Sequence, residues 1–344
     1  MIKLRLSKME SLADVQAAVQ TAIDLEFSTL PPYLYALYSI RPGANEPAVA
    51  RLKDIAEEEM IHFCLACNIL NAIGGSPKLN VPKFPGTLPG DIGQDENGDP
   101  FIVHVVRFSE AAMKQGMRIE EPEDPIDPPV ATVAATSVVA PEAGTIGEYY
   151  RHLEQRLSQL PPSDWQADRN QIGDGQFFAG QLFKVNNFAD ASQAISDIVS
   201  EGEGSSKSPL DFQGDVSHFY RFEEVFRNRI LTKADNDVGY VWGDPLGIDW
   251  SAVYPAIEDP SQHDFSQEPP AAQQAQLKCN AAFSDMVDAL EKAFNGEPGQ
   301  LGVGVRQMFA LRQATSEALT TPLSDGQSVA GPSFVYLPKA QRGN

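Results

Sequence analysis

The stretch that decides the fold is AEEEMIHF, residues 56–63, which places three glutamates and a histidine inside a helical pattern of apolar residues. An amphipathic helix buries residues spaced alternately by three and four. Glu59 and His62 take successive positions on the buried side, whereas Glu57 and Glu58 fall off it and can be solvated. Residues i and i+3 share a helix face, so Glu59 and His62 can offer an oxygen and a nitrogen to one cation. The full stripe reads Leu52, Ile55, Glu59, His62, Ala66, Ile69 and Ile73.

Two other segments put polar residues on buried stripes. Glu26 occupies a core position in the preceding helix, on the stripe Val15, Val19, Ala22, Glu26, Leu30, Tyr33 and Leu37. Asp215 and His218 repeat the carboxylate-x-x-His spacing later in the chain, on the stripe Phe212, Asp215, His218, Phe222 and Val225. Between the pair Glu59 and His62 and the pair Asp215 and His218, SEGEGSS (200–206) holds Glu201 and Glu203. The helical period alone does not decide which of these two glutamates faces the core.

Carboxylates on buried stripes require cations, because an unpaired buried charge is too costly. Neither of the first two helices places Lys or Arg on its stripe, so a metal is the remaining cation. Two carboxylate-x-x-His pairs and one Glu from each of two other helices form the metal site of di-iron and di-manganese bundles. We therefore predict two Fe ions, or Mn, and no haem. The predicted metal ligands are Glu26, Glu59, His62, Glu203, Asp215 and His218, with Glu201 as the alternate.

Composition excludes several classes of function. The chain has 344 residues, 42% of them hydrophobic, and a net charge of −21, which repels nucleic acid and anionic membrane surfaces. The N-terminus has no signal-peptide pattern, and no apolar run reaches the roughly 20 residues of a membrane span. These features favour a cytoplasmic protein without nucleic-acid or membrane partners.

The remaining cysteines and histidines carry no second motif. Cys64 and Cys67 form a CxxC inside a helical pattern with no histidine after it, so we interpret them as small core residues. His104, His152 and His263 lack a paired carboxylate at helical spacing and are expected to be structural or on the surface. Glu148 is a spare candidate ligand.

The chain is expected to form one mainly α domain, residues 1–344, built on a four-helix bundle with one long crossover. Further helices are predicted near 109–116, 145–160, 271–295 and 300–320, joined by long ordered loops. The bundle helices are predicted over about 11–40, 46–73, 188–206 and 209–230, with elaborations over 76–187 and 233–344.

The same segments resemble the ferritin-like domain of the iminophenyl-pyruvate dimer synthase family, which includes violacein- and rebeccamycin-pathway enzymes. The matching pieces are EFSTLPPYLYALYSI (26–40), IAEEEMIHFCLACNILNAIGG (55–75), IVSEGEG (198–204), SHFYRFEEV (217–225) and GDPLGIDWSAVYP (243–255). The resemblance spans roughly residues 10–320. It implies a ferritin-like bundle with metal-site positions at Glu26, Glu59, His62, Glu203 and His218. Asp215 stands where the family usually has Glu.

The leading functional hypothesis is a non-haem dinuclear metal oxidoreductase that uses dioxygen on a small aromatic or amino-acid-derived substrate. The alternatives are a metal-storage protein without an organic substrate and a metal-free scaffold. The sequence leaves open the substrate, the choice of Fe or Mn, and whether the chain forms a homo-oligomer.

Overall fold

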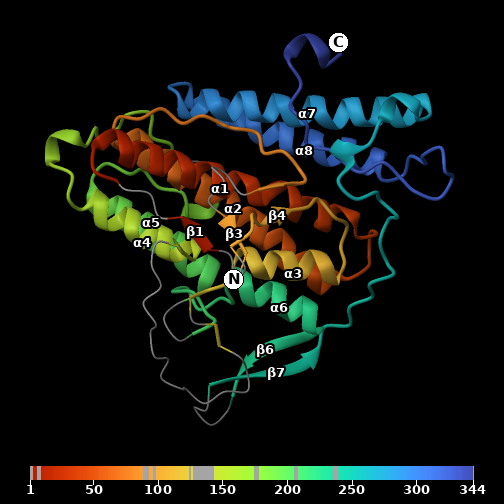
Figure 1. Ribbon diagram of the computed structural model, residues 1–344, viewed down its shortest axis with the longest axis horizontal. Coiled ribbons are helices and arrows are strands. Elements are labelled where there is room, and N and C mark those ends of the chain that lie inside the picture. The colour runs from red at the N-terminus through yellow and green to blue at the C-terminus, as the bar shows by residue number, and fades with distance from the viewer. Residues whose placement is uncertain are drawn as a thin grey trace.

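Two long helices form the centre of the protein in the computed structural model. The structure describes residues 3–5, 9–87, 93–95, 98–123, 125–126, 143–173, 178–204, 208–234 and 239–343. Helix α1 (Leu12–Ser39) begins at a capping box formed by Ser11 and Asp14, and helix α2 (Glu46–Ala72) packs along it (Figure 1). Both agree closely with the helices predicted over 11–40 and 46–73.

The fourth bundle helix is interrupted. Helix α5 (Phe188–Glu203) and helix α6 (His218–Arg227) follow one another along α2 (Figure 1). Four ion pairs show their order along α2. As the residue numbers in α2 increase, the residue numbers of the partners decrease, first through α6 and then into α5. These pairs are Arg51–Glu224, Glu58–Arg221, Glu59–His218 and His62–Glu201.

The third bundle helix is interrupted at the same level. Helix α3 (Glu110–Ile119) packs against α6, and helix α4 (Ile146–Leu157) packs against α5. Along α1, Tyr33 bonds to Glu120 at the end of α3, and Glu26 bonds to Tyr150 of α4. The four-helix bundle therefore consists of α1, α2, α3 with α4, and α5 with α6.

The helix predicted over 209–230 is shorter than expected, and this corrects one inference. Residues 210–216 form a tight loop in which the backbone N–H of Asp211 donates to the carbonyl of Asp215, and the N–H of Asp215 donates to the Asp211 side chain. Gly214 in this loop has a φ of 93°, which suits glycine. Asp side chains that bond to nearby backbone compete with helix. The segments 188–206 and 209–230 are predicted as two separate bundle helices, whereas α5 and α6 are successive pieces of one interrupted helix.

The elaborations cover the bundle on two sides. Helices α7 (Pro270–Phe294) and α8 (Leu301–Ala318) form a hairpin that packs on α1 and α2 (Figure 1). Strand β6 (Arg229–Lys233) pairs antiparallel with β7 (Tyr240–Pro245) after α6. Short antiparallel pairs join β1 (Lys3–Arg5) to β3 (Gly93–Gln94) and β5 (Ala143–Gly144), and β2 (Gly86–Thr87) to β4 (Ile102–Val103). Residues 333–338, SFVYLP, have a sequence typical of a strand, but the structure describes them and they form none.

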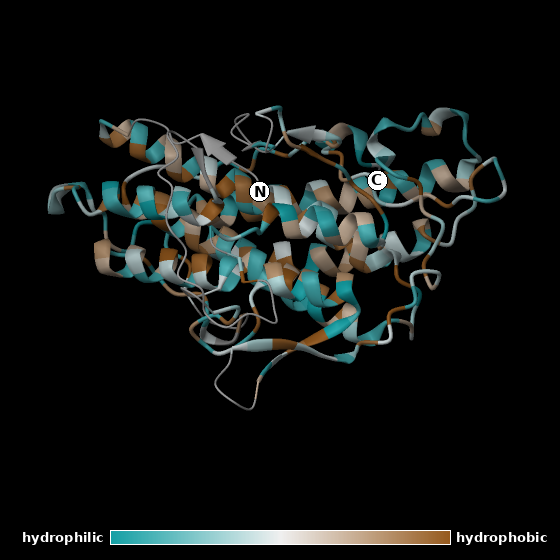
Figure 2. Ribbon diagram, turned by 60° about the horizontal axis from the view of Figure 1, so that its bottom comes forward, coloured by the Kyte–Doolittle hydropathy of each residue, from teal (hydrophilic) through white to brown (hydrophobic). Residues whose placement is uncertain are grey.

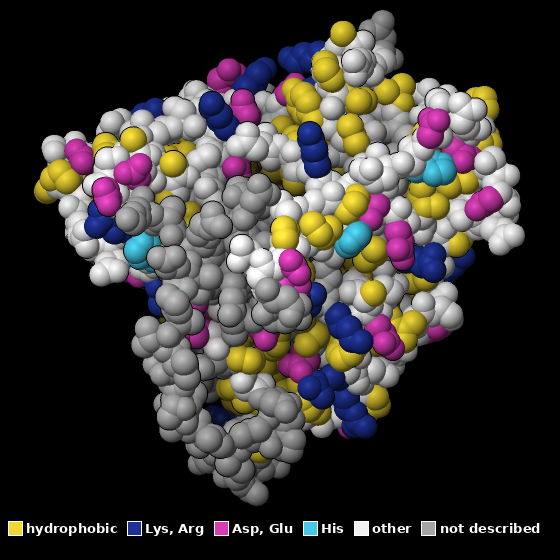
Figure 3. Space-filling view, in the orientation of Figure 1, with side chains coloured by type: hydrophobic (Ala, Val, Ile, Leu, Met, Phe, Trp, Pro, Cys, Tyr) yellow, Lys and Arg dark blue, Asp and Glu magenta, His cyan; other side chains and the backbone are white. Residues whose placement is uncertain are grey.

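Apolar and polar residues alternate along the helices in the way that the sequence predicts (Figure 2). The buried faces form one large apolar core among α1, α2, α4, α5, α7 and α8. On the surface shown in Figure 3, Lys and Arg side chains are scattered among Asp and Glu. Among the described residues, no helix has the length and apolar character needed to cross a membrane.

Candidate metal centre

Five buried ionisable side chains meet where the third and fourth bundle helices are interrupted. Each is at most 5% exposed. All four helices of the bundle contribute. Glu26 comes from α1, Glu59 and His62 from α2, Glu120 from the end of α3, and His218 from the start of α6.

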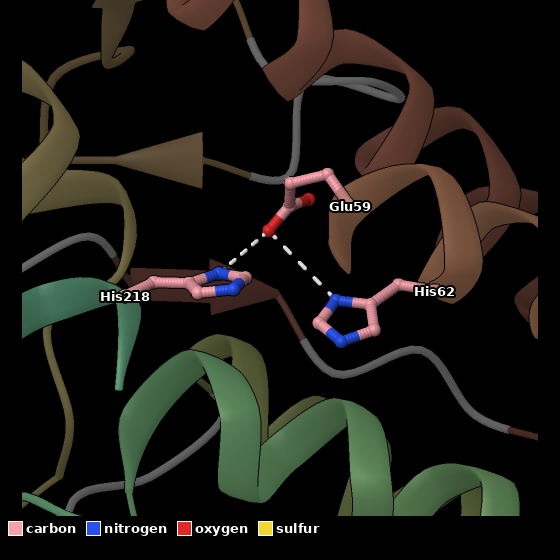
Figure 4. Close-up of side chains that lie close together, drawn as sticks. All are labelled: Glu59, His62 and His218. Carbon is pink, nitrogen blue, oxygen red and sulfur yellow. Dashed lines mark ion pairs between the residues drawn. The ribbon is translucent and has the colours of Figure 1, made fainter. Parts of the chain in front are cut away.

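Glu59 lies between the two histidines, as Figure 4 shows. Its Oε1 is 2.8 Å from Nδ1 of His218 and 3.8 Å from Nδ1 of His62. Ligand atoms of these three residues all lie within 4.8 Å of one another, as the ligands of a metal ion do. The two imidazole rings are 5.4 Å apart between centroids.

The outer carboxylates repeat this arrangement on each side. Glu26 Oε2 is 3.7 Å from Nδ1 of His62, and Glu120 Oε2 is 3.9 Å from Nδ1 of His218. Each imidazole Nδ1 thus faces one carboxylate of its own and shares Glu59 with the other. The result is two adjacent groups of nitrogen and oxygen donors with one carboxylate in common.

The other ring nitrogens are held by carboxylates outside the cluster. Nε2 of His62 is 2.8 Å from Glu201, and Nε2 of His218 is 2.8 Å from Glu58. Glu58 also accepts a hydrogen bond of 2.7 Å from Nη1 of Arg221. Histidines that bind metals usually donate their second N–H to such a partner, which fixes the tautomer and the ring orientation.

The carboxylates of the cluster are positioned by hydroxyl donors. Tyr150 donates to Oε1 of Glu26 at 2.5 Å, Thr29 donates to Oε2 of Glu59 at 2.8 Å, and Tyr33 donates to Oε1 of Glu120. In each case the oxygen nearest an imidazole is the other one of the carboxylate. The hydroxyls therefore hold one oxygen and leave the second directed toward the ring nitrogens.

One buried nitrogen provides a test of whether a cation fits. Nδ1 of His218 lies 2.8 Å from Oε1 of Glu59, yet it has no hydrogen-bond partner among the described residues. An orphaned buried donor is unusual, because it costs the desolvation of that group. A nitrogen and a carboxylate oxygen this close, yet not hydrogen-bonded, are arranged as two ligands of one cation are.

A family model decides the wider assignment: the Ferritin-like model matches residues 19–227, which include all five side chains. The chain belongs to the Ferritin-like family. A ferritin-like protein from Caulobacter vibrioides has the same fold, with a TM-score of 0.64 and 25% identity. The match covers 95% of this chain and 100% of that one.

Two curated relatives of the ferritin-like chain are named as a synthase and a dimerase. Dichlorochromopyrrolate synthase from Lentzea aerocolonigenes is 22% identical over 392 residues, a match that covers 95% of this chain and 37% of the relative. 2-Imino-3-(indol-3-yl)propanoate dimerase from Chromobacterium violaceum is 25% identical over 255 residues, covering 64% of this chain and 23% of the relative. The chain therefore spans a little more than a third of the first relative and less than a quarter of the second.

Burial sets the charges of the ferritin-like centre. Burial raises the pKa of Glu26, and burial together with the charge of Glu59 raises the pKa of Glu120 to about 8. Burial disfavours the cationic form of both imidazoles, but the surrounding carboxylates outweigh it. The pKa of His218 rises to about 9, and that of His62 rises well above its usual value. The pKa of Glu59 falls despite its burial, because the two histidines lie beside it. Without a metal, bound protons supply the positive charge that the carboxylates need.

The structure brings four of the predicted ligands together: Glu26, Glu59, His62 and His218. Two of the other three lie near this group. Glu201 bonds to the outer nitrogen of His62. Glu203 lines a small cavity that Glu26, Glu59, His62 and Glu120 also line, but its Oε1 accepts a hydrogen bond of 2.7 Å from the N–H of Gly147 at the start of α4.

Asp215 does not share a helix face with His218, which corrects the predicted carboxylate-x-x-His pair. It is exposed, and it lies in the loop before α6 rather than inside the helix. Glu58 also differs from expectation: it is half-buried and bonded to His218 and Arg221, whereas Glu57 is exposed.

Glu120 is the member of the cluster that the sequence reading missed. It follows a helix predicted to end near residue 116, inside the proline-rich stretch IEEPEDP (119–125), and so reads as part of a loop. Extending the stripe of Met113 and Gly116 by one turn would have reached it. Gly116 lets α3 approach α6 closely, since a Cβ there would come within 2.7 Å of the Phe222 ring.

Other residues considered from the sequence lie outside the cluster. Glu148 forms a capping box with Thr145 at the start of α4. Cys64 and Cys67 are buried and free, and burial raises the pKa of both thiols. His104 pairs with Asp259 at 2.7 Å, and His263 pairs with Glu268 at 2.9 Å.

Proposed function

We propose that this ferritin-like protein is a non-haem dinuclear metal oxidoreductase that acts with dioxygen on a small organic substrate. The observation that carries the proposal is the repeated arrangement at the centre, in which each imidazole Nδ1 faces its own carboxylate and both share Glu59. Such a set offers ligands to two ions with one carboxylate between them.

Each residue has a distinct role in this proposal. Glu26 and His62 would hold one ion, Glu120 and His218 would hold the second, and Glu59 would contact both. Mixed oxygen and imidazole ligands suit Fe or Mn. Bound there, the metal would supply redox chemistry with dioxygen. Glu203, Glu201 and Asp215, the other predicted ligands, lie outside this proposed set.

The surrounding residues prepare the site without taking part in the redox step. Glu201 and Glu58 orient the two imidazoles, and the hydroxyls of Tyr150, Thr29 and Tyr33 orient the three carboxylates. Groups held in this way need little rearrangement when a cation binds. The low exposure of the whole cluster also keeps bulk water from its donor atoms.

An outer cavity gives the organic substrate a route to the centre. It has a volume of about 510 Å³ and is lined by Arg151 and Tyr220, among others. It shares Val199 and Glu203 with the smaller cavity that holds Glu26, Glu59 and Glu120. We infer that a small substrate enters beside the interrupted helices. Two relatives are named a synthase and a dimerase, which supports an enzyme, and an aromatic or amino-acid-derived substrate is part of the proposal.

Metal content is the decisive experiment. We expect native protein to carry close to two Fe or Mn ions per chain by elemental analysis, and to consume dioxygen when supplied with a suitable substrate. Glu59→Gln removes the shared carboxylate and should lose most of the metal, whereas Asp215→Asn should retain it.

The same experiment separates the alternative functions. Native protein without stoichiometric metal would leave only a scaffold and contradict the proposal. Metal that accumulates well beyond two ions per chain, with no dioxygen-dependent turnover of aromatic imines or amino acids, would indicate storage instead.

A further inference from the structure

An apolar cavity lies on the opposite face of α1 and α2 from the metal centre. It is enclosed by α1 and α2 on one side and by the α7–α8 hairpin on the other, and its volume is about 70 Å³. Its walls include Leu30 from α1, Phe63 from α2, Phe283 from α7 and Leu311 from α8, each of them buried.

The chemistry of the walls selects a small apolar occupant. Among the described residues that line the cavity, none is charged and only Tyr38 carries a hydroxyl group. Apolar cavities stay free of water, and one of about 150 Å³ takes up benzene or xenon. The present cavity is about half that size, so it suits a diatomic gas better than an aromatic ring.

Two aromatic rings separate this cavity from the metal centre. Phe27 follows Glu26 in α1, Phe63 follows His62 in α2, and both phenyl rings line the cavity. The rings are 5.7 Å apart between centroids and are at most 2% exposed. Because neighbouring residues of a helix point to different sides, Glu26 and His62 face the metal centre while the two rings face the cavity. The pair therefore forms the wall between the two spaces.

We propose that this cavity binds dioxygen and delivers it to the metal centre past Phe27 and Phe63. The inference rests on the proposed function, since it needs a centre that consumes dioxygen. Dioxygen and the organic substrate then approach from opposite faces of α1 and α2, because the larger cavity opens beside α4 and α5. Neither ligand blocks the route of the other.

Xenon and a cavity-filling variant test the proposal together. Xenon is an apolar atom that reports gas sites in pressurised crystals, and it requires no metal or turnover. Met308→Phe adds a ring to the cavity from α8, and the matched control Val305→Phe adds a ring to a half-buried position of α8 outside the cavity lining. We expect bound xenon in native protein and in the control, and none in Met308→Phe.

The second readout is the rate at which anaerobic Fe(II)-loaded protein reacts with dioxygen in a stopped-flow instrument. Met308→Phe should slow this reaction several-fold with metal content and thermal stability unchanged, and Val305→Phe should react at the native rate. An empty cavity in xenon-pressurised native crystals would overturn the proposal, and so would equal rates in the two variants. Failure of the proposed function shows itself differently, as native protein that binds no Fe or Mn.

Discussion

At the scale of single residues, the centre depends on which nitrogen each histidine turns inward. Both His62 and His218 direct Nδ1 toward Glu59 and bond through Nε2 to a carboxylate outside the cluster. The bond at Nε2 fixes the tautomer and the orientation of each ring, and so keeps Nδ1 directed toward the cluster. The helix that supplies each ring differs, so this common arrangement is a property of the site.

Glu120 gives the first prediction at this scale. In Glu120→Gln the proposed second ion would lose its own carboxylate, so we expect close to one metal ion per chain by elemental analysis. The amide has nearly the same size as the carboxyl group, so the fold should be kept, which circular dichroism can check. Two ions per chain in Glu120→Gln would exclude Glu120 from the proposed ligand set.

Glu58 gives a prediction about positioning. The cations around Glu58 outweigh its burial and lower its pKa to about 2, so it is ionised and holds the outer nitrogen of His218. Glu58→Gln should weaken metal binding by roughly 10- to 100-fold, the usual cost of removing such a partner. The affinity is measured by titration with Fe(II) or Mn(II) under anaerobic conditions.

Glu57→Gln is the matched control, because Glu57 is exposed and pairs with Lys53 of the preceding turn, at 2.9 Å. Its metal affinity should equal that of the native protein. Equal affinities in the two variants would show that Glu58 does not act through His218.

At the scale of elements, the interruption of two bundle helices places the centre. The end of α3 supplies Glu120, and the start of α6 supplies His218. The start of α4 and the end of α5 line the small cavity beside these two residues. An uninterrupted helix would cover this level with its own side chains. The breaks therefore make room for the small cavity beside the cluster, which the proposed substrate route uses, as well as for the proposed ligands.

A buried amide of α2, that of Asn68, helps to hold the segment between α4 and α5. Asn68 accepts a bond from the N–H of Ile172 and donates to the carbonyls of Ile172 and Phe183, at 2.7 to 3.0 Å. Asn68→Ala leaves these buried backbone groups unpaired and should lower the free energy of unfolding by about 2 kcal/mol.

Chemical denaturation measures this loss. Asn80→Ala is the control, because the Asn80 amide is exposed and bonds to Asp24, and its effect should stay below about 0.5 kcal/mol. A similar loss in both variants would mean that burial of the Asn68 bonds has no special effect.

At the scale of the whole molecule, the centre makes stability depend on pH. In the metal-free protein the pKa of Glu120 is raised to about 8 and that of His218 to about 9, above their ordinary values of 4.5 and 6.5. A raised pKa in the folded state means that folding favours the protonated form. This stabilisation is present below the ordinary pKa and is lost as the pH rises through the raised one.

We therefore expect the melting temperature of the metal-free protein to fall as the pH is raised from about 6 to about 9. Metal-loaded protein should lose less, because its ligands are already deprotonated and the cations replace the protons. Scanning calorimetry of both forms at the same pH values gives the comparison. A parallel decline in the two forms would assign the effect to the rest of the acidic chain.

The sequence by itself determined the long helices and part of the centre. Burial periodicity identified α1 and α2 and placed Glu26, Glu59 and His62 inward, because that pattern is local to each helix. His218 was found by its spacing from Asp215, although Asp215 itself lies in a loop. A regular helix carries its orientation in its own residues, and this is why these predictions agree with the structure.

Only the tertiary structure decided where the interrupted helices resume and which carboxylates they present. Glu120 reads as a loop residue, yet the packing of α3 on α6 brings it beside His218. Glu201 and Glu203 are two residues apart on one helix, and only their neighbours, His62 and Gly147, distinguish them. Contacts between segments far apart in the chain settle such choices, since helical period describes one segment at a time.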